Sequence, residues 1–284
     1  MKPGVCLLAV LAVTLSAQTP GKGGVESGYA PVNGLKMYFE SRGKGAPLIL
    51  VHGGVVGITM FGGNVEALAR NRRVIAVELQ GHGHTADIDR PLTFEAMADD
   101  VAALSRHLGL QRIDVMGYSL GGGVVLQTAI RHPELVGRLV VVSAPFQRQG
   151  MYPEVLAAMS QMGPQAGEVM KQSPLAKMYP GVNWATLFTK LGQLLSKDYD
   201  WSAQVRAIRA PTLLVYADAD AVRPEHIVEF YKLLGGGLGD AGQDGARRSA
   251  NQLAVIPGCT HYSISAAPAL VTPVESFLGP ASQR

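Results

Sequence analysis

The chain has 284 residues, of which 47% are hydrophobic and 17% are charged, a composition typical of a globular protein rather than a disordered or coiled one. The formal net charge of +3 is too small, and its lysines and arginines are too scattered, to indicate a nucleic-acid-binding surface. The sequence contains no zinc-binding spacing of cysteines and histidines, no phosphate-binding loop and no EF-hand motif. We therefore expect one main domain that carries an insertion, with no metal site.

The first 17 residues, MKPGVCLLAVLAVTLSA, predict a secretory signal peptide. Lys2 precedes an apolar run of eleven residues, which is too short to cross a bilayer as a helix. Cleavage after Ala17 would remove Cys6 and leave Cys259 as the only cysteine, so the mature fold would hold without an internal disulfide. An uncleaved anchor or a buried strand is the alternative. We expect a secreted or periplasmic protein without stable membrane insertion.

A linker is expected over residues 18–30, and strands that alternate with helices follow it. The edge strand LKMYFE comes first. Six runs rich in Val, Ile and Leu, typical of a parallel sheet covered on both faces, are PLILVH (47–52), RRVIAVEL (72–79), RIDVMG (112–117), RLVVVS (138–143), PTLLVY (211–216) and QLAVIPG (252–258). One helix between them is expected to begin after Thr93 and to end at Gly109. The pattern predicts an α/β fold with an open, doubly wound, mostly parallel sheet.

Residues 146–210 interrupt this alternation because they show helical patterns only. They predict a small helical cap inserted into a core of residues 31–145 and 211–284. We expect the methionines of this segment mainly to pack the cap against the core, with the lining of a substrate site as the alternative; they are Met151, Met159, Met162, Met170 and Met178. The Gly-rich residues 234–251 predict a mobile loop.

The segment MGYSLGGG, residues 116–123, places Ser119 between glycines at the junction of a predicted strand and a predicted helix. G-x-S-x-G in this context is typical of a serine nucleophile on a sharp turn, for which Gly117, Gly121 and Gly122 leave room. Because a serine hydroxyl is a weak nucleophile, it needs a neighbouring base. An ordinary Gly-rich turn is the alternative.

His261, in IPGCTHY, directly follows the last predicted strand, where an open α/β sheet places its reactive groups. His107, His132 and His226 lie in or at the end of predicted helices, and His82 and His84 lie in the loop GHGHT, so we assign the base to His261. Asp220, in PTLLVYADAD, is the expected carboxylate that orients this histidine, with Asp218 as the alternative. The chain order Ser119, Asp220, His261 is that of one superfamily of hydrolases.

The segment LVHGGVVG follows the first core strand and predicts an oxyanion hole rather than a simple glycine turn. The expected donors are the backbone N–H groups of Gly54 and Leu120, and such donors contribute roughly 3–4 kcal/mol each. We expect Gly53, Tyr118 and Tyr262 to contact the substrate.

From about residue 31 to its C-terminus the chain resembles the α/β-hydrolases, on HGG (52–54), ELQGHGHT (78–85), GYSLGG (117–122), PTLLVYADAD (211–220) and PGCTHY (257–262). Glu78, Thr85 and Ala217 stand where Asp, Ser and Gly are usual, and none of the three is a predicted catalytic group. The likeness is greatest to small esterases, enol-lactonases and cofactor-free perhydrolases. The resemblance implies no metal and no organic cofactor.

Together with the predicted signal peptide, the resemblance implies an exported serine hydrolase that cleaves carboxylic ester or lactone bonds of small, fairly apolar molecules through an acyl-enzyme. A C–C bond hydrolase, a perhydrolase and a non-catalytic binding protein are the alternatives. Haloalkane dehalogenases and epoxide hydrolases carry an aspartate where Ser119 stands, so they are not expected. The predicted partner is a small-molecule substrate, and the oligomeric state stays open.

Overall fold

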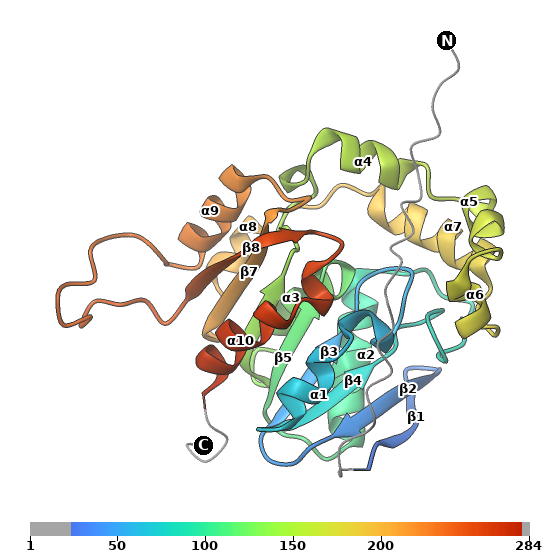
Figure 1. The fold of residues 1–284 in the computed structure, drawn as a ribbon, viewed down its shortest axis with the longest axis horizontal. Helices are drawn as coiled ribbons and strands as arrows, with labels where there is room; N and C mark the ends of the chain where they lie inside the picture. The colour runs from blue at the N-terminus through green and yellow to red at the C-terminus, as the bar shows by residue number, and fades with distance from the viewer. Residues whose placement is uncertain (1–23, 280–284) are drawn as a thin grey trace.

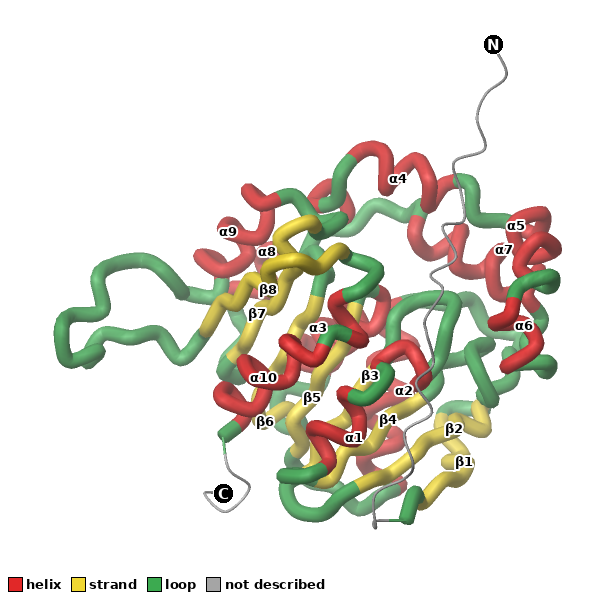
Figure 2. Tube along the Cα trace, viewed as in Figure 1, coloured by secondary structure: helices red, strands yellow, loops and turns green. Residues whose placement is uncertain are grey.

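The computed structural model describes residues 24–279, so the predicted signal peptide lies outside the described residues. Within them, a single sheet carries helices on both of its faces (Figures 1 and 2). Its strands are β1 (Glu26–Val32), β2 (Leu35–Arg42), β3 (Pro47–Val51), β4 (Arg73–Val77), β5 (Ile113–Tyr118), β6 (Val136–Val142), β7 (Thr212–Ala219) and β8 (Gln252–Thr260). The helices are α1 (Asn64–Ala69), α2 (Phe94–His107), α3 (Leu120–Arg131), α4 (Pro153–Ser160), α5 (Pro164–Met170), α6 (Pro174–Met178), α7 (Trp184–Leu195), α8 (Ser202–Arg206), α9 (Pro224–Leu233) and α10 (Val271–Leu278).

The strand order is β1-β2-β4-β3-β5-β6-β7-β8, and the strands from β4 to β8 in this order are parallel. The predicted doubly wound α/β fold is confirmed. Two expectations were wrong. Part of the predicted linker 18–30 belongs to β1, which pairs antiparallel with β2. The predicted edge strand LKMYFE belongs to β2, which lies between β1 and β4 and is therefore not at the edge. Asn33 and Gly34 join β1 and β2, both with positive φ (45° and 85°), as a two-residue hairpin requires. The Asn-Gly pair was the sequence signal for this hairpin.

The parallel strands are buried on both faces, and successive residues point to opposite sides of the sheet. On one face, Val115 and Val141 belong to the core that α2 and α3 cover. On the other face, Met116 and Val140 belong to the core that α1 and α10 cover. This two-sided burial explains the nearly continuous apolar runs in the sequence.

Helix α2 begins and ends where the sequence predicts. The hydroxyl of Thr93 accepts a hydrogen bond from the N–H of Ala96 at 3.0 Å, which caps the first turn. Gly109 follows the helix with a φ of 69°, a conformation that glycine adopts without strain.

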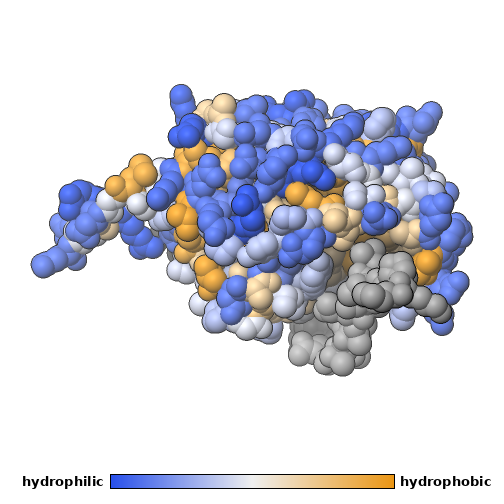
Figure 3. All heavy atoms as spheres, turned by 90° about the horizontal axis from the view of Figure 1, so that it is seen from above, coloured by the Kyte–Doolittle hydropathy of each residue, from blue (hydrophilic) through white to orange (hydrophobic). Residues whose placement is uncertain are grey.

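Helices α4 to α8 lie between β6 and β7 in the chain. In Figure 1, α4 lies at the top of the molecule, and α5, α6 and α7 lie on its right side. We call residues 146–210 the insertion. The Nζ of Lys190 in α7 lies 2.9 and 2.7 Å from the two carboxylate oxygens of Asp87, and this ion pair joins the insertion to the core. Seen from above, the molecule shows a mainly hydrophilic surface with small hydrophobic patches (Figure 3).

Residues 234–251 form a long loop between α9 and β8 that projects from the body of the molecule (Figures 1 and 2). Strand β8 pairs only with β7 and therefore forms one edge of the sheet. Across residues 24–279, every helix is too short or too polar to cross a membrane.

Candidate active site

Ser119 occupies the sharp turn between β5 and α3, with φ 52° and ψ −115°. This backbone conformation is strained for any residue other than glycine, and it persists only where the surroundings enforce it. The surroundings are tight, because a Cβ atom at Gly117 would lie 2.0 Å from the carbonyl oxygen of Gly121. A Cβ atom at Gly121 would lie 2.3 Å from the carbonyl oxygen of Val51. The predicted need for glycines around the serine therefore has a direct steric cause.

The structure brings the three predicted side chains together at the carboxyl ends of neighbouring strands. The Oγ atom of Ser119, after β5, lies 3.0 Å from Nε2 of His261. The Nδ1 atom of His261, after β8, lies 3.0 Å from Oδ1 of Asp220, after β7. An imidazole that donates from Nδ1 to a carboxylate is left with Nε2 as an acceptor, so this chain of hydrogen bonds can remove the serine proton.

Asp220 is a buried carboxylate surrounded by donors. Its Oδ2 accepts from the hydroxyl of Ser143 at 2.5 Å and from the N–H of Ala217 at 3.0 Å. Its Oδ1 accepts from His261 and from the N–H of Val222 at 3.2 Å. Burial by itself would raise the pKa of Asp220, but the hydrogen bonds from His261, Ser143 and Ala217 outweigh it and hold that pKa below its ordinary value. The carboxylate is therefore ionised at neutral pH.

Asp218, the alternative acid, is exposed and faces another part of β8. Its Oδ1 accepts a hydrogen bond from the N–H of Cys259 at 3.2 Å. Backbone N–H groups of Gly258 and Cys259 lower the pKa of Asp218, so it too is ionised at neutral pH. Geometry separates the two aspartates, since Asp220 accepts the hydrogen bond that His261 donates from Nδ1.

The two residues predicted to supply the oxyanion donors, Gly54 and Leu120, are in contact. Leu120 is the first residue of α3, so its N–H is one of those that helix geometry leaves unpaired at the positive end of the helix. Gly54 lies against the Leu120 side chain, because a Cβ atom at Gly54 would be 3.9 Å from Leu120 Cδ2. The next residue, Val55, has a φ of 76°, which is rare for a β-branched residue and marks this loop as strained.

His52 supports the same loop, a role that the sequence reasoning missed. Its Nε2 accepts from the N–H of Leu79 at 3.1 Å, and its Nδ1 lies 2.6 Å from the carbonyl oxygen of Gly53. Burial lowers the pKa of His52 to about 3, so the ring is neutral and Nδ1 carries the proton that it donates. The available signal was the position of His52, directly between a buried strand and a glycine pair.

Three predicted substrate contacts occupy other positions. Tyr118 is buried, and its hydroxyl donates to the carbonyl oxygen of His261 at 2.5 Å. Gly53 is buried under the same ring, since a Cβ atom there would lie 2.8 Å from Tyr118. Tyr262 is 63% exposed, with its ring centroid 5.3 Å from that of His261. Tyr118 therefore supports the loop that carries His261, and none of the three residues lines the cleft over Ser119.

A narrow cleft, partly open to solvent, lies over Ser119. The core, including α3, forms one part of its wall, and the insertion forms the rest. Its lining residues are Phe94, Ser119, Leu120, Gly123, Ala144, Pro145, Met151, Met159, Leu195 and Tyr199. Two of the five methionines of the insertion thus line the cleft, whereas Met170 is buried in the core and Met178 is 41% exposed. The wall carries no charged side chain.

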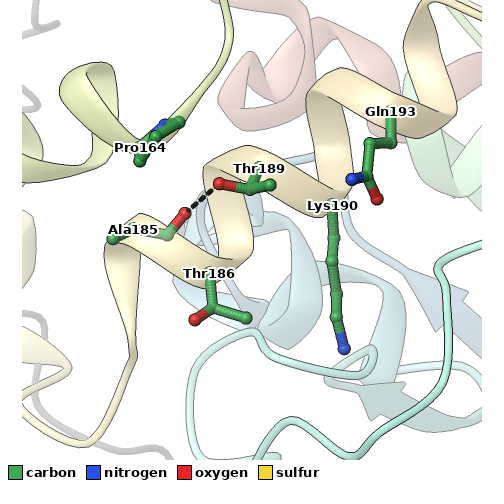
Figure 4. A pocket seen from close by; sticks show the side chains of 6 residues that line it. All are labelled: Pro164, Ala185, Thr186, Thr189, Lys190 and Gln193. Carbon is green, nitrogen blue, oxygen red and sulfur yellow. Dashed lines mark hydrogen bonds between the residues drawn. The ribbon is translucent and has the colours of Figure 1, made fainter.

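A second hollow lies on the outer side of α7 and contains none of the three reactive groups (Figure 4). Thr186, Thr189, Lys190 and Gln193 of α7 line it together with Pro164 and Ala185. The Thr189 hydroxyl is already used, because it donates to the carbonyl oxygen of Ala185 at 2.7 Å. Among residues 24–279 no group of three or more histidine, cysteine, aspartate or glutamate side chains could hold a metal ion.

Known proteins resemble this chain in sequence and in fold. A family model described as the alpha/beta hydrolase family matches residues 48–274. Among curated proteins, 2-hydroxymuconate semialdehyde hydrolase from Pseudomonas sp. (strain CF600) is 33% identical over 115 residues, which are 39% of this chain and 41% of that protein. Matches of this kind span 30% to 43% of the lengths of the curated relatives.

Solved structures match over nearly the whole chain. An esterase from Thermogutta terrifontis has a TM-score of 0.68 at 24% identity and covers 90% of this chain and 98% of its own. The enol-lactonase from Burkholderia xenovorans LB400 has a TM-score of 0.66 at 22% identity, with 88% of this chain and 99% of its own covered. At these identities the likeness establishes the shared fold.

Proposed function

Because the chain belongs to the alpha/beta hydrolase family, we propose that it is a serine hydrolase that cleaves carboxylic ester or lactone bonds of small, neutral, fairly apolar molecules. The observation that carries this proposal is the unbroken hydrogen-bond chain from Ser119 through His261 to Asp220. It joins an ionised acid and a base to a nucleophile that lines an apolar cleft.

In the first half of the reaction, the Oγ atom of Ser119 attacks the carbonyl carbon of the substrate while Nε2 of His261 takes its proton. The carbonyl oxygen gains negative charge, which the N–H groups of Gly54 and Leu120 stabilise together with the positive end of α3. His261 then gives the proton to the leaving alcohol oxygen, and the acyl group stays on Ser119. Asp220 stabilises the protonated imidazole throughout.

In the second half, water replaces the alcohol. His261 removes a proton from this water, which attacks the acyl carbon, and the charge again develops at Gly54 and Leu120. The bond to Ser119 Oγ then breaks, and the proton on His261 returns to the serine. The product is a carboxylic acid, and no group of the protein is consumed.

The wall of the cleft supports the substrate class. Its side chains are apolar or neutral, and a carboxylate bound among them would be desolvated without a cationic partner. The cleft is narrow, which suits a small acyl group. Simple esters and lactones therefore fit this site better than substrates with a second, ionised carboxyl group.

We also propose that the protein is exported. The support is the composition of residues 1–17, with Lys2 ahead of an apolar run that small residues follow. N-terminal sequencing of the protein from the medium or periplasm checks this proposal, and a start near Gln18 is the expected result. An intact Met1 in a membrane fraction would contradict it.

The activity is tested with p-nitrophenyl acetate, butyrate and octanoate and with a γ-lactone. We expect turnover of the shorter esters, and a loss of about 10⁶-fold in kcat when Ser119 is replaced by alanine. A fluorophosphonate probe should label the natural protein and leave Ser119→Ala unlabelled.

The other outcomes separate the alternatives. Labelling of Ser119 without ester or lactone turnover would contradict the proposed substrate class and favour C–C bond hydrolysis or acyl transfer to peroxide. A folded protein that neither turns over these substrates nor reacts with the probe would contradict the enzyme itself and favour a binding protein.

A further inference from the structure

Four neighbouring strands of the sheet are each followed, at the carboxyl end, by a residue with a polar side chain. In the order β5, β6, β7 and β8, these side chains are Ser119, Ser143, Asp220 and His261. Three of them form the hydrogen-bond chain of the proposed reaction. Ser143, directly after β6, is fully buried and has no part in proton transfer. Its position raises the question of what a serine does there.

The hydroxyl of Ser143 donates to Oδ2 of Asp220 at 2.5 Å. The other carboxylate oxygen, Oδ1, faces Nδ1 of His261 at 3.0 Å. Rotation of the carboxylate about its last bond would exchange the two oxygens and break both contacts. The bond from Ser143, together with the N–H of Ala217 on the same oxygen, opposes this rotation.

The backbone of Ser143 is held in a costly conformation. Its φ is 52°, and within residues 24–279 only Asn33, Val55 and Ser119 share a positive φ among residues other than glycine. Asn33 belongs to a hairpin turn, whereas Val55 and Ser119 belong to the candidate active site. The N–H of Ser143 donates to the carbonyl oxygen of Val215 at 2.9 Å, which ties the strained residue to β7. Strain of this kind is retained where it positions a side chain for function.

From this geometry we propose that Ser143 is a positioning residue, which fixes the Asp220 carboxylate in the orientation that binds His261. The proposal rests on the proposed function and extends it by one residue. Ser143 does not touch the substrate or the reacting atoms, so it acts through Asp220 alone. Its removal should therefore change kcat, leave KM unchanged, and have no effect once Asp220 cannot perform its role.

The test compares Ser143→Ala, Ser143→Gly, Asp220→Asn and the double variant Ser143→Ala/Asp220→Asn in the full-length protein. Ser143→Gly relieves the backbone strain, and Ser143→Ala keeps it, but both remove the hydroxyl. We expect each to lower kcat by roughly 10- to 100-fold, the size of one hydrogen bond to a charged group. The double variant should be no slower than Asp220→Asn. Ser105→Ala, which removes a buried hydroxyl within α2, is the matched control and should keep the natural rate.

A proton NMR measurement provides a readout that does not depend on turnover. The proton between His261 Nδ1 and Asp220 should resonate far downfield in the natural protein, shift or broaden in both Ser143 variants, and stay in place in Ser105→Ala. A Ser143→Ala kcat within twofold of the natural value, beside an inactive Asp220→Asn, would overturn the inference. So would a Ser143→Ala loss that appears in full in the double variant.

The two proposals can fail separately. If the natural protein and Ser119→Ala are equally inactive, the proposed function fails, and the NMR signal still decides whether Ser143 orients Asp220. If Ser143→Ala unfolds, which thermal denaturation reveals, Ser143→Gly carries the same comparison, because glycine accepts a φ of 52°. An unshifted resonance in a folded Ser143→Gly would contradict the inference.

Discussion

The carboxyl edge of the sheet and the insertion above it build one cleft in different ways. The edge contributes Ser119, Asp220 and His261, each tied to its place by hydrogen bonds or by a tight turn. The insertion contributes Met151, Met159, Leu195 and Tyr199, which form the wall by packing. Groups that exchange protons thus come from the rigid core, and groups that shape the space come from the inserted segment.

This division has a physical basis. Proton transfer depends on distances near 3 Å and on the direction of each donor, and buried strand ends hold such geometry well. A wall of methionine and leucine needs only suitable volume, and methionine adapts to irregular shapes. One fold can therefore keep its reactive groups while its insertion selects among substrates. Substitutions in the core and in the insertion test this division of roles.

The largest expected effect falls on the core. Asp220→Asn should lower kcat by about 10⁴-fold, because an amide cannot stabilise the imidazolium and favours the wrong tautomer of His261. Steady-state kinetics with p-nitrophenyl butyrate checks this loss, and circular dichroism checks that the variant folds.

Asp218→Asn is the matched control, since Asp218 is an exposed aspartate two residues earlier, near the end of β7. It should keep most of the natural kcat. A large loss from Asp218→Asn with little loss from Asp220→Asn would reverse the assignment of the acid.

The second prediction concerns the point where the insertion leaves the core. His226 of α9 stacks on Phe146, the first residue of the insertion, with ring centroids 4.1 Å apart, and its Nε2 accepts from the Phe146 N–H. Burial lowers the pKa of His226 and of His82 to about 4, and the pKa of His52 to about 3. All three rings are therefore neutral in the folded protein at neutral pH.

In the unfolded chain these histidines return to a pKa of about 6.5. Below that pH the unfolded chain binds more protons, so the free energy of unfolding decreases as the pH falls toward 4, by up to about 1.4 kcal/mol per pH unit for each histidine. Above pH 6.5 or so these groups give no pH dependence. Urea unfolding at several pH values measures the slope.

His226→Gln keeps an acceptor for Phe146 and removes one titrating group, so it should reduce this slope by about a third. Equal slopes in the natural protein and in His226→Gln would show that His226 does not titrate in this way.

The smallest expected effect falls on the insertion. Met159→Ala should enlarge the cleft and raise the ratio of kcat/KM for the octanoate ester to that for the acetate ester by roughly tenfold. Met178→Ala is the control, because Met178 is 41% exposed and lies outside the cleft wall. An equal octanoate-to-acetate ratio of kcat/KM in both variants would contradict this division of roles, since the insertion would then not select the substrate.

The sequence by itself determined the parallel sheet, because strands buried on both faces must be nearly continuous runs of apolar residues. It also determined the nucleophile turn, where the steric limits around Ser119 demand glycine at fixed spacings. These features depend on neighbours along the chain. The hairpin at Asn33 and Gly34 carried a similar local signal, although the segment before it was predicted to be a linker.

Only the tertiary structure decided which side chains meet. Three contacts show this, and each joins residues from different strands. His261 bonds to Asp220 rather than to Asp218, Ser143 bonds to Asp220, and the Tyr118 hydroxyl bonds to the carbonyl oxygen of His261. Ser143 and Asp220 are 77 positions apart, and the order of strands in the sheet brings them together. Local patterns record propensity and burial, whereas such contacts depend on strand order and side-chain rotation, which no short stretch of sequence contains.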